Sequence, residues 1–264
     1  MLGKQNTFAL RIFYTLFYLA AIKLSTKAFI NYNKSCNMWT IFDTYDIIKQ
    51  YYSVTGETMN SIKWLFFDLG STLIDETECI KKRCNNIIEK NNIDKDEFYI
   101  KVRECAKTNS YAVKTAAEYY GVDTPRWYGE LEKLYSDVDE ILYKLSQKYK
   151  LGIIANQQIG TQERINNWGI GKYFDIVIAS AEAGFSKPDL RIFNMALEQA
   201  KCKANETIMI GDRLDNDIVP AKRLGMKTIW VRQGFAKFQS VKNENEKPNY
   251  VIENIGEIIN ILLN

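Results

Sequence analysis

The stretch WLFFDLGSTLIDE, residues 64–76, decides the fold because an apolar strand runs directly into a carboxylate. We predict a strand over residues 63–68 that is buried on both faces, as the strands of parallel sheets are. A carboxylate at the end of such a strand needs partners, so Asp68 is a candidate functional group rather than a simple strand cap. Gly70 follows two positions later, and its lack of a side chain lets the backbone approach a ligand closely.

Strands and helices alternate along the second half of the chain. Apolar strands are predicted over residues 151–155, 174–180, 207–210 and 227–231. Helices are predicted between and after these strands, over residues 160–169, 188–200, 216–224 and 255–263. This alternation predicts an α/β fold with a doubly wound parallel sheet of the Rossmann-like kind.

The domain organisation follows from where the helical residues fall. Residues 76–148 are helical in character and come directly after the first strand. We expect them to form a small helical cap over the sheet edge where open α/β sheets bind ligands. The α/β core then comprises residues 59–75 and 149–264, and residues 1–58 form an N-terminal helical extension.

The N-terminal extension contains an apolar, aromatic run at residues 8–22, which is shorter than a comfortable membrane span. Three interpretations remain open: amphipathic helices or an appendage outside the native core, a membrane-surface anchor, or a signal peptide. The first is favoured. We therefore expect a cytoplasmic protein whose only membrane contact would run through residues 8–22.

The composition excludes several kinds of chemistry. The chain has no histidine, which removes Ser-His-Asp triads, histidine-ligated zinc and histidine general bases. The net charge is +3 with acids and bases interspersed, so no nucleic-acid partner is predicted. Five cysteines are scattered without a CxxC motif, which is typical of reduced cytosolic thiols: Cys36, Cys79, Cys84, Cys105 and Cys202.

Charged and amide side chains follow the predicted strands, at the carboxyl edge of the sheet: Asp68, Asn156, Lys187, Asp212 and Asp217. Three ionised carboxylates cannot lie close together without a cation. Because no histidine or cysteine accompanies them, a hard divalent ion held by oxygen fits best, and we predict Mg²⁺. The predicted ligands are the three aspartates and the carbonyl oxygen of Gly70.

The loop after the first strand suits an anionic ligand. The backbone N–H groups of residues 69–72, which include Ser71 and Thr72, can point toward an oxyanion. Lys187 adds a point charge for a phosphate oxygen, and Asn156 or Gln157 can donate an amide N–H group. The loop therefore suits an anionic group such as a phosphate.

Four stretches, in this order, resemble motifs of the haloacid dehalogenase-like (HAD) hydrolase superfamily, in the subgroup with a helical cap: FFDLGSTL, LGIIANQ, SKPD and IGDRLDND. The resemblance spans residues 62–234. It implies that Asp68 is a nucleophile that forms an aspartyl-phosphate, which water then hydrolyses. It also implies that Lys187 steadies the transferring group, that Asp212 binds Mg²⁺ directly and that Asp217 is a second acid of the metal site.

The sequence departs from the family pattern at two positions. Phosphatases of the family usually have a second aspartate where this chain has Gly70, and that residue protonates the leaving group and later activates water. They usually have serine or threonine where this chain has Ala155. Without the acid, we expect a weakened activity that favours leaving groups needing little protonation, such as those of aryl and acyl phosphates.

We predict a Mg²⁺-dependent, phosphatase-type hydrolase of a small phosphorylated metabolite. Two alternatives remain open. A metal-independent haloacid dehalogenase-like hydrolase would use the same aspartate nucleophile. A non-catalytic protein of this fold would bind a phosphate ligand or a partner without turnover. The residues carry no signal for an oligomeric state.

Overall fold

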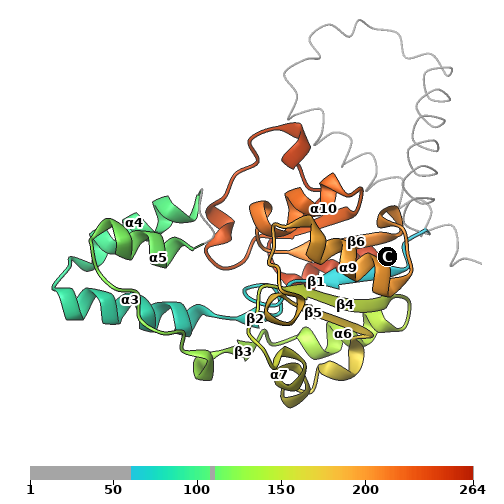
Figure 1. Cartoon of the computed structure of the whole chain (residues 1–264), viewed down its shortest axis with the longest axis horizontal. Coiled ribbons are helices and arrows are strands. Elements are labelled where there is room, and N and C mark those ends of the chain that lie inside the picture. The colour runs from blue at the N-terminus through green and yellow to red at the C-terminus, as the bar shows by residue number, and fades with distance from the viewer. Residues whose placement is uncertain (1–60, 108–110, 264) are drawn as a thin grey trace, which may run out of the picture. The chain divides into compact units, whose positions relative to one another are not determined.

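The computed structural model describes residues 61–107 and 111–263 (Figure 1). The predicted N-terminal extension, with its three interpretations, lies outside the described residues. Within the described part of the chain, no helix has the length and hydropathy of a membrane span.

A parallel sheet of six strands forms the centre of the fold, in the order β5-β4-β1-β6-β7-β8. The strands are β1 (Trp64–Phe67), β4 (Lys150–Ala155), β5 (Ile176–Ala179), β6 (Thr207–Gly211), β7 (Lys227–Val231) and β8 (Tyr250–Ile252). β1 lies between β4 and β6, so that Phe67 is opposite Ile153 on one side and Ile210 on the other. The predicted α/β fold with a parallel sheet is confirmed.

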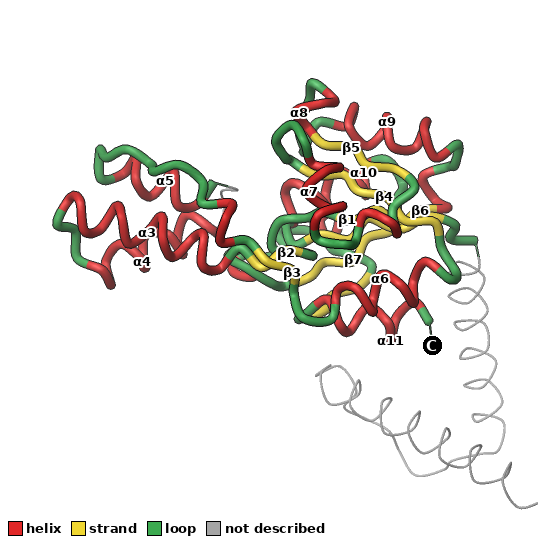
Figure 2. Tube along the Cα trace, turned by 90° about the horizontal axis from the view of Figure 1, so that it is seen from below, coloured by secondary structure: helices red, strands yellow, loops and turns green. Residues whose placement is uncertain are grey.

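Helices cover both faces of the sheet, because alternate strand residues point to opposite sides. Leu65 and Phe67 join a cluster with α6 (Val138–Ser146) and α11 (Ile258–Leu262). Phe66 joins the opposite cluster with α9 (Leu190–Ala200) and α10 (Val219–Arg223). Figure 2 shows these two pairs of helices on opposite sides of the strands. The first predicted strand is therefore buried on both faces, as its unbroken apolar run indicated.

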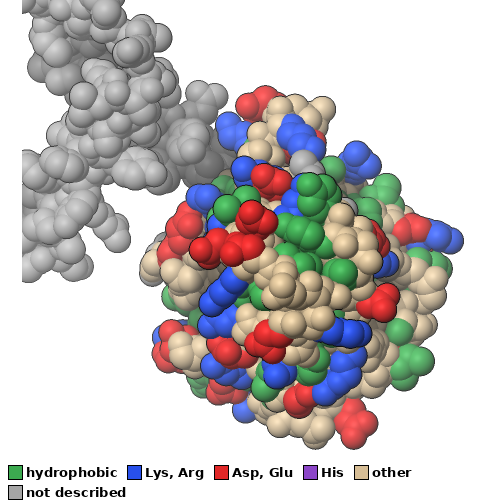
Figure 3. All heavy atoms as spheres, turned by 90° about the vertical axis from the view of Figure 1, so that its left-hand side faces the viewer, with side chains coloured by type: hydrophobic (Ala, Val, Ile, Leu, Met, Phe, Trp, Pro, Cys, Tyr) green, Lys and Arg blue, Asp and Glu red, His purple; other side chains and the backbone are tan. Residues whose placement is uncertain are grey.

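Three helices follow β1 and pack on one another: α3 (Thr77–Asn91), α4 (Lys95–Ala106) and α5 (Ala112–Tyr119). We call them the helical insertion. The chain enters and leaves it through a short antiparallel pair of strands, β2 (Ile74–Asp75) and β3 (Lys133–Leu134). Figure 3, which views the molecule from the side of the helical insertion, shows acidic and basic side chains interspersed on this face.

The predicted cap boundary at residue 148 stays a prediction, although the packing of α6 favours an earlier boundary. It assigned α6 to the cap, but Ile141, Leu142 and Leu145 of this helix are buried in the same cluster as β1 and β4. The strong apolar stripe of α6 thus belongs to the cover of the sheet. We propose that the insertion ends at β3, before α6 begins.

Two further details differ from the expectations. β8 was not predicted, because three residues after a polar loop give too short a pattern to recognise. The helix expected over residues 216–224 begins instead with a π-helical turn, Leu214–Ile218, before α10. The four described cysteines are free thiols: Cys79, Cys84, Cys105 and Cys202.

Candidate active site

The candidate site lies at the carboxyl edge of the sheet, where the ends of three parallel strands meet. Asp68 follows β1, Asn156 follows β4 and Asp212 follows β6. Lys187 comes from the loop between β5 and α9, and Asp217 from the π-helical turn after β6. These side chains line one cavity of about 690 Å³, together with residues of the helical insertion.

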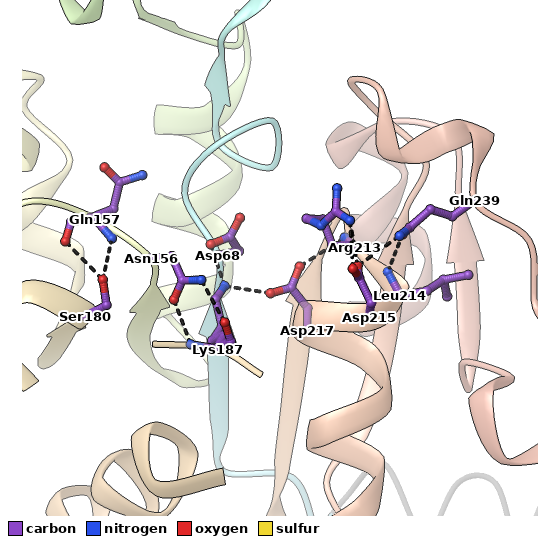
Figure 4. Close-up of polar contacts among 10 residues, drawn as sticks. All are labelled: Asp68, Asn156, Gln157, Ser180, Lys187, Arg213, Leu214, Asp215, Asp217 and Gln239. Carbon is purple, nitrogen blue, oxygen red and sulfur yellow. Dashed lines mark hydrogen bonds and ion pairs between the residues drawn. The ribbon is translucent and has the colours of Figure 1, made fainter. Parts of the chain in front are cut away.

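Lys187 forms a buried bridge between two carboxylates (Figure 4). Its Nζ atom lies 2.6 Å from Oδ1 of Asp68 and 2.6 Å from Oδ1 of Asp217. Burial opposes the charged ammonium, but the attraction of Asp217 and Asp68 outweighs it and raises the pKa of Lys187. The lysine therefore remains a fixed positive charge beside Asp68.

Asn156 holds the loop that carries this lysine. Its side-chain Oδ1 accepts a hydrogen bond of 2.7 Å from the backbone N–H of Lys187, and its Nδ2 donates one of 2.9 Å to the carbonyl of Lys187. The amide thus aligns Lys187, a role that the sequence analysis did not assign to it. A contact between Asn156 and phosphate stays a prediction.

Three carboxylates crowd together beside the lysine. One oxygen from each of Asp68, Asp212 and Asp217 lies within 4.8 Å of the others. Burial, followed by repulsion from Asp217 and Asp68, raises the pKa of Asp212 well above its usual value. Burial also raises the pKa of Asp217 to about 6, although Lys187 opposes this shift. If all three carboxyl groups were ionised, they would carry more negative charge than one ammonium group balances, and the raised pKa values reflect this repulsion together with burial.

The donor set fits a hard divalent cation such as Mg²⁺. All the converging side-chain donors are carboxylate oxygens, and such ions prefer oxygen ligands. Within the described residues, the Asp212 carboxylate accepts no hydrogen bond, so its lone pairs remain available to a cation. Asp217 is already engaged by Lys187 and by the backbone N–H of Arg213, at 3.0 Å from its Oδ2. Asp212 is therefore better suited than Asp217 to bind the ion directly.

The π-helical turn brings Asp217 into the cluster. The backbone N–H groups of Asp217 and Ile218 both donate to the carbonyl of Arg213. The side chain of Gln239 accepts from the N–H of Leu214 at 2.8 Å and so fixes the start of the turn. A Cβ atom at Gly211 would collide with the Asp217 carboxylate, so this position requires glycine.

The remaining predicted phosphate contacts occupy different places. Ser71 adopts a positive φ of 54°, and its hydroxyl donates to Oε2 of Glu76 at 2.9 Å. Thr72 is fully buried, and its hydroxyl has no hydrogen-bond partner in the described part of the protein. Gln157 lines the cavity, and its Oε1 accepts a hydrogen bond of 2.6 Å from Arg164. Their roles as phosphate ligands stay predictions.

The sequence analysis missed Glu76, which immediately precedes α3 and lines the same cavity. Loss of water around the carboxyl raises its pKa to about 8, against the hydrogen bond from Ser71, and Asp68 adds to the rise. A carboxyl group that keeps its proton near neutral pH can act as a general acid. Acidic residues are common at the start of a helix because they interact favourably with the helix dipole, so nothing in the sequence singles out Glu76.

The arrangement agrees with what comparison with known proteins finds. Residues 65–231 match the haloacid dehalogenase-like hydrolase family. The chain belongs to this family. It is therefore a HAD-like hydrolase, as the four motifs indicated.

Three similar proteins illustrate the range of the family relationship. A glyceraldehyde 3-phosphate phosphatase of Pyrococcus furiosus is 29% identical over 231 residues, which are 77% of this chain and 94% of that protein. One from Methanocaldococcus jannaschii is 39% identical over 116 residues, which are 44% of this chain and half of that protein. The crystal structure of a HAD phosphatase from Thermococcus onnurineus is 26% identical, with a TM-score of 0.54 over 76% of this chain and 98% of that one.

Proposed function

We propose that this HAD-like hydrolase is a Mg²⁺-dependent phosphatase of small phosphorylated metabolites, with Asp68 as the nucleophile. One observation carries the proposal: Lys187 lies 2.6 Å from Oδ1 of Asp68, in a cavity that also holds Asp212 and Asp217. A carboxylate held beside a fixed cation is suited to attack an anionic phosphoryl group.

The reaction would proceed in two displacements at phosphorus. Asp68 attacks the phosphorus of the ester, the alcohol leaves, and water hydrolyses the aspartyl-phosphate. Lys187 neutralises part of the charge on the transferring group, and Asn156 keeps that lysine in position. Asp68, Asp212, Asp217 and the Gly70 carbonyl would hold Mg²⁺, which when bound offsets the charge of the carboxylates and the phosphate.

The relatives support a small phosphate ester as substrate. Those from Pyrococcus furiosus and Methanocaldococcus jannaschii are named glyceraldehyde 3-phosphate phosphatase. Glyceraldehyde 3-phosphate is thus the first candidate substrate. We further propose that the helical insertion acts as the cap that selects it, and that the protein works in the cytoplasm, where its thiols stay reduced.

A substrate panel tests this function. The full-length protein is assayed with glyceraldehyde 3-phosphate and other small phosphate esters, with Mg²⁺ and with EDTA, beside Asp68→Asn as the control. We expect Mg²⁺-dependent phosphate release that the control lacks. Release of halide from a haloacid in EDTA would instead favour the dehalogenase. Binding of beryllofluoride with Mg²⁺, but no turnover, would favour a phosphate-binding protein.

Asp212→Asn distinguishes a loss of Mg²⁺ binding from a loss of folding stability. The substitution removes one of the crowded buried carboxylates, so the metal-free protein should become more resistant to thermal unfolding. The rise in melting temperature that Mg²⁺ causes in the wild-type protein should be lost at the same time. A variant that Mg²⁺ still stabilises as fully as the wild type would contradict the proposed role of Asp212.

A further inference from the structure

The space beside Gly70 is occupied by a carboxyl group from elsewhere in the chain. A Cβ atom built on Gly70 would lie 2.6 Å from Oε1 of Glu76 and 3.0 Å from its Cδ and Oε2 atoms. Such a contact is too close for any side chain at position 70 unless Glu76 moves. The missing side chain and the Glu76 carboxyl therefore compete for one place in the site.

The contacts of Glu76 hold its carboxyl there. Ser71, the residue after Gly70, donates its hydroxyl hydrogen to Oε2 at 2.9 Å. Oε1, the atom nearest the vacant side-chain position, accepts no hydrogen bond within the described residues. The carboxyl is thus anchored through Oε2, and Glu76 lines the cavity that it shares with Asp68.

One other acid, Glu132, lines the cavity on the side of the insertion. The Glu132 side chain is 2% exposed, accepts a hydrogen bond of 2.6 Å from Trp127 and lies 3.8 Å from the Arg164 Nε atom. Glu76 has no ion pair within the described part of the chain. Of these two acids, Glu76 is therefore the one that no cation neutralises within the described residues.

We propose that Glu76 is the catalytic acid and base of this enzyme, acting from the place that a side chain at position 70 would occupy. The assignment rests on the proposed phosphatase function, because it needs a leaving group and a water at phosphorus.

Glu76 loses one proton in the first displacement and regains one in the second. As the bond from Asp68 to phosphorus forms and the ester P–O bond breaks, the Glu76 carboxyl gives its proton to the departing oxygen, which leaves as an alcohol. The Glu76 carboxylate then takes a proton from water as the water oxygen attacks phosphorus. The bond between phosphorus and Asp68 breaks, and phosphate, free Asp68 and protonated Glu76 result.

This assignment changes the substrate preference expected from Gly70 alone. The wild-type protein should hydrolyse alkyl esters, because Glu76 can protonate their leaving group. A variant that lacks the Glu76 proton should instead prefer esters whose leaving group is easily expelled. Gly70→Asp by itself should not help, because its side chain would meet the Glu76 carboxyl.

Glu76→Gln tests the assignment, because glutamine keeps the shape and the acceptor for Ser71 but cannot donate an acidic proton. We expect kcat/KM for glycerol 3-phosphate to fall by about 10²–10⁴-fold, the usual contribution of a positioned acid or base. The value for 4-nitrophenyl phosphate should fall far less, and its assay should show a burst of one nitrophenolate per enzyme, since the base for the second step is missing. Glu78→Gln, an exposed acid of the same helix, is the matched control and should leave both values unchanged.

A second variant moves the carboxyl to its alternative position. Gly70→Asp combined with Glu76→Ala should hydrolyse glycerol 3-phosphate faster than Glu76→Ala alone. The role of Glu76 would be overturned if Glu76→Gln lost kcat/KM equally on both esters without a burst, or if it lost none. It would also be overturned if the double variant were no faster than Glu76→Ala. A wild-type protein that hydrolyses no phosphate ester and binds no beryllofluoride would overturn the proposed function itself.

Discussion

The sheet and the helical insertion bury different kinds of side chain. Isoleucine, leucine and phenylalanine dominate the clusters around the sheet, with Phe66 and Phe67 fully buried in β1. Alanine supplies four of the nine buried residues in the cluster of α3, α4 and α5. Because alanine buries little apolar area, the insertion gains less stability per residue than the sheet. Side-chain contacts such as the hydrogen bonds of 3.1 and 3.0 Å from Arg83 to the Pro125 carbonyl supplement it.

The sheet and the insertion also position their acidic residues in the site in different ways. The sheet places Asp68 and Asp212 through its backbone, because parallel strands end at a common edge. The insertion contributes Glu76, whose position depends on how α3 leaves β2 and on one hydrogen bond from Ser71. Acids on the sheet are thus fixed by topology, whereas the acid from the insertion is fixed by tertiary contacts. Three comparisons test this contrast, beginning with the largest expected loss of stability.

Lys187→Met should cause the largest loss of stability. It leaves two buried carboxylates without their cation, which typically costs about 3–5 kcal/mol of the free energy of unfolding. Urea unfolding of the metal-free protein measures the change. Lys150→Met is the matched control, because the Lys150–Asp175 pair is exposed and its loss should cost less than about 1 kcal/mol. Similar losses in the two variants would contradict the view that the buried bridge organises the site.

Two glycine substitutions compare the packing of the regions directly. A Cβ atom at Gly152 in β4 would lie 2.6 Å from ring atoms of Phe66, so Gly152→Ala should overpack the sheet and cost about 1–3 kcal/mol. At Gly129, in the loop that returns from the insertion, the nearest atom belongs to Trp127 at 3.6 Å. Gly129→Ala should therefore change the denaturation midpoint little. Equal destabilisation by both substitutions would remove the packing contrast.

Ala116→Gly should cost less stability than Lys187→Met and no more than Gly152→Ala. It removes a fully buried methyl group from α5 and adds backbone freedom, at a cost of about 1–2 kcal/mol. Hydrogen exchange should speed up in α3, α4 and α5 and stay unchanged in the strands if the insertion opens separately. Faster exchange across the whole protein would mean that the two regions unfold as one unit.

Much of the fold could be predicted from local patterns. The apolar run before Asp68 and the strand–helix alternation after residue 150 carry their own periodicities, and the parallel sheet follows from them. The end of the insertion could not be predicted in this way. α6 has the same helical character as α3, α4 and α5, and only packing shows that it covers the sheet instead.

The site divides along the same line. Motifs at strand ends located Asp68, Lys187, Asp212 and Asp217, because a parallel sheet must bring those ends together. Asn156 lines the same cavity, but its hydrogen bonds to Lys187 depend on a loop 31 residues away. A pattern of residue types does not specify which polar groups will pair within a crowded site.

The sequence by itself determined the sheet, the order of its strand-end residues and the oxygen-rich chemistry, since these follow from hydrophobic periodicity and from the absence of histidine. Only the tertiary structure decided what fills the space beside Gly70. Glu76 is six residues further along the chain, at the start of a helix, where an acid has an ordinary explanation. Its meeting with Gly70 results from the direction in which the chain turns after β1, which no local pattern encodes.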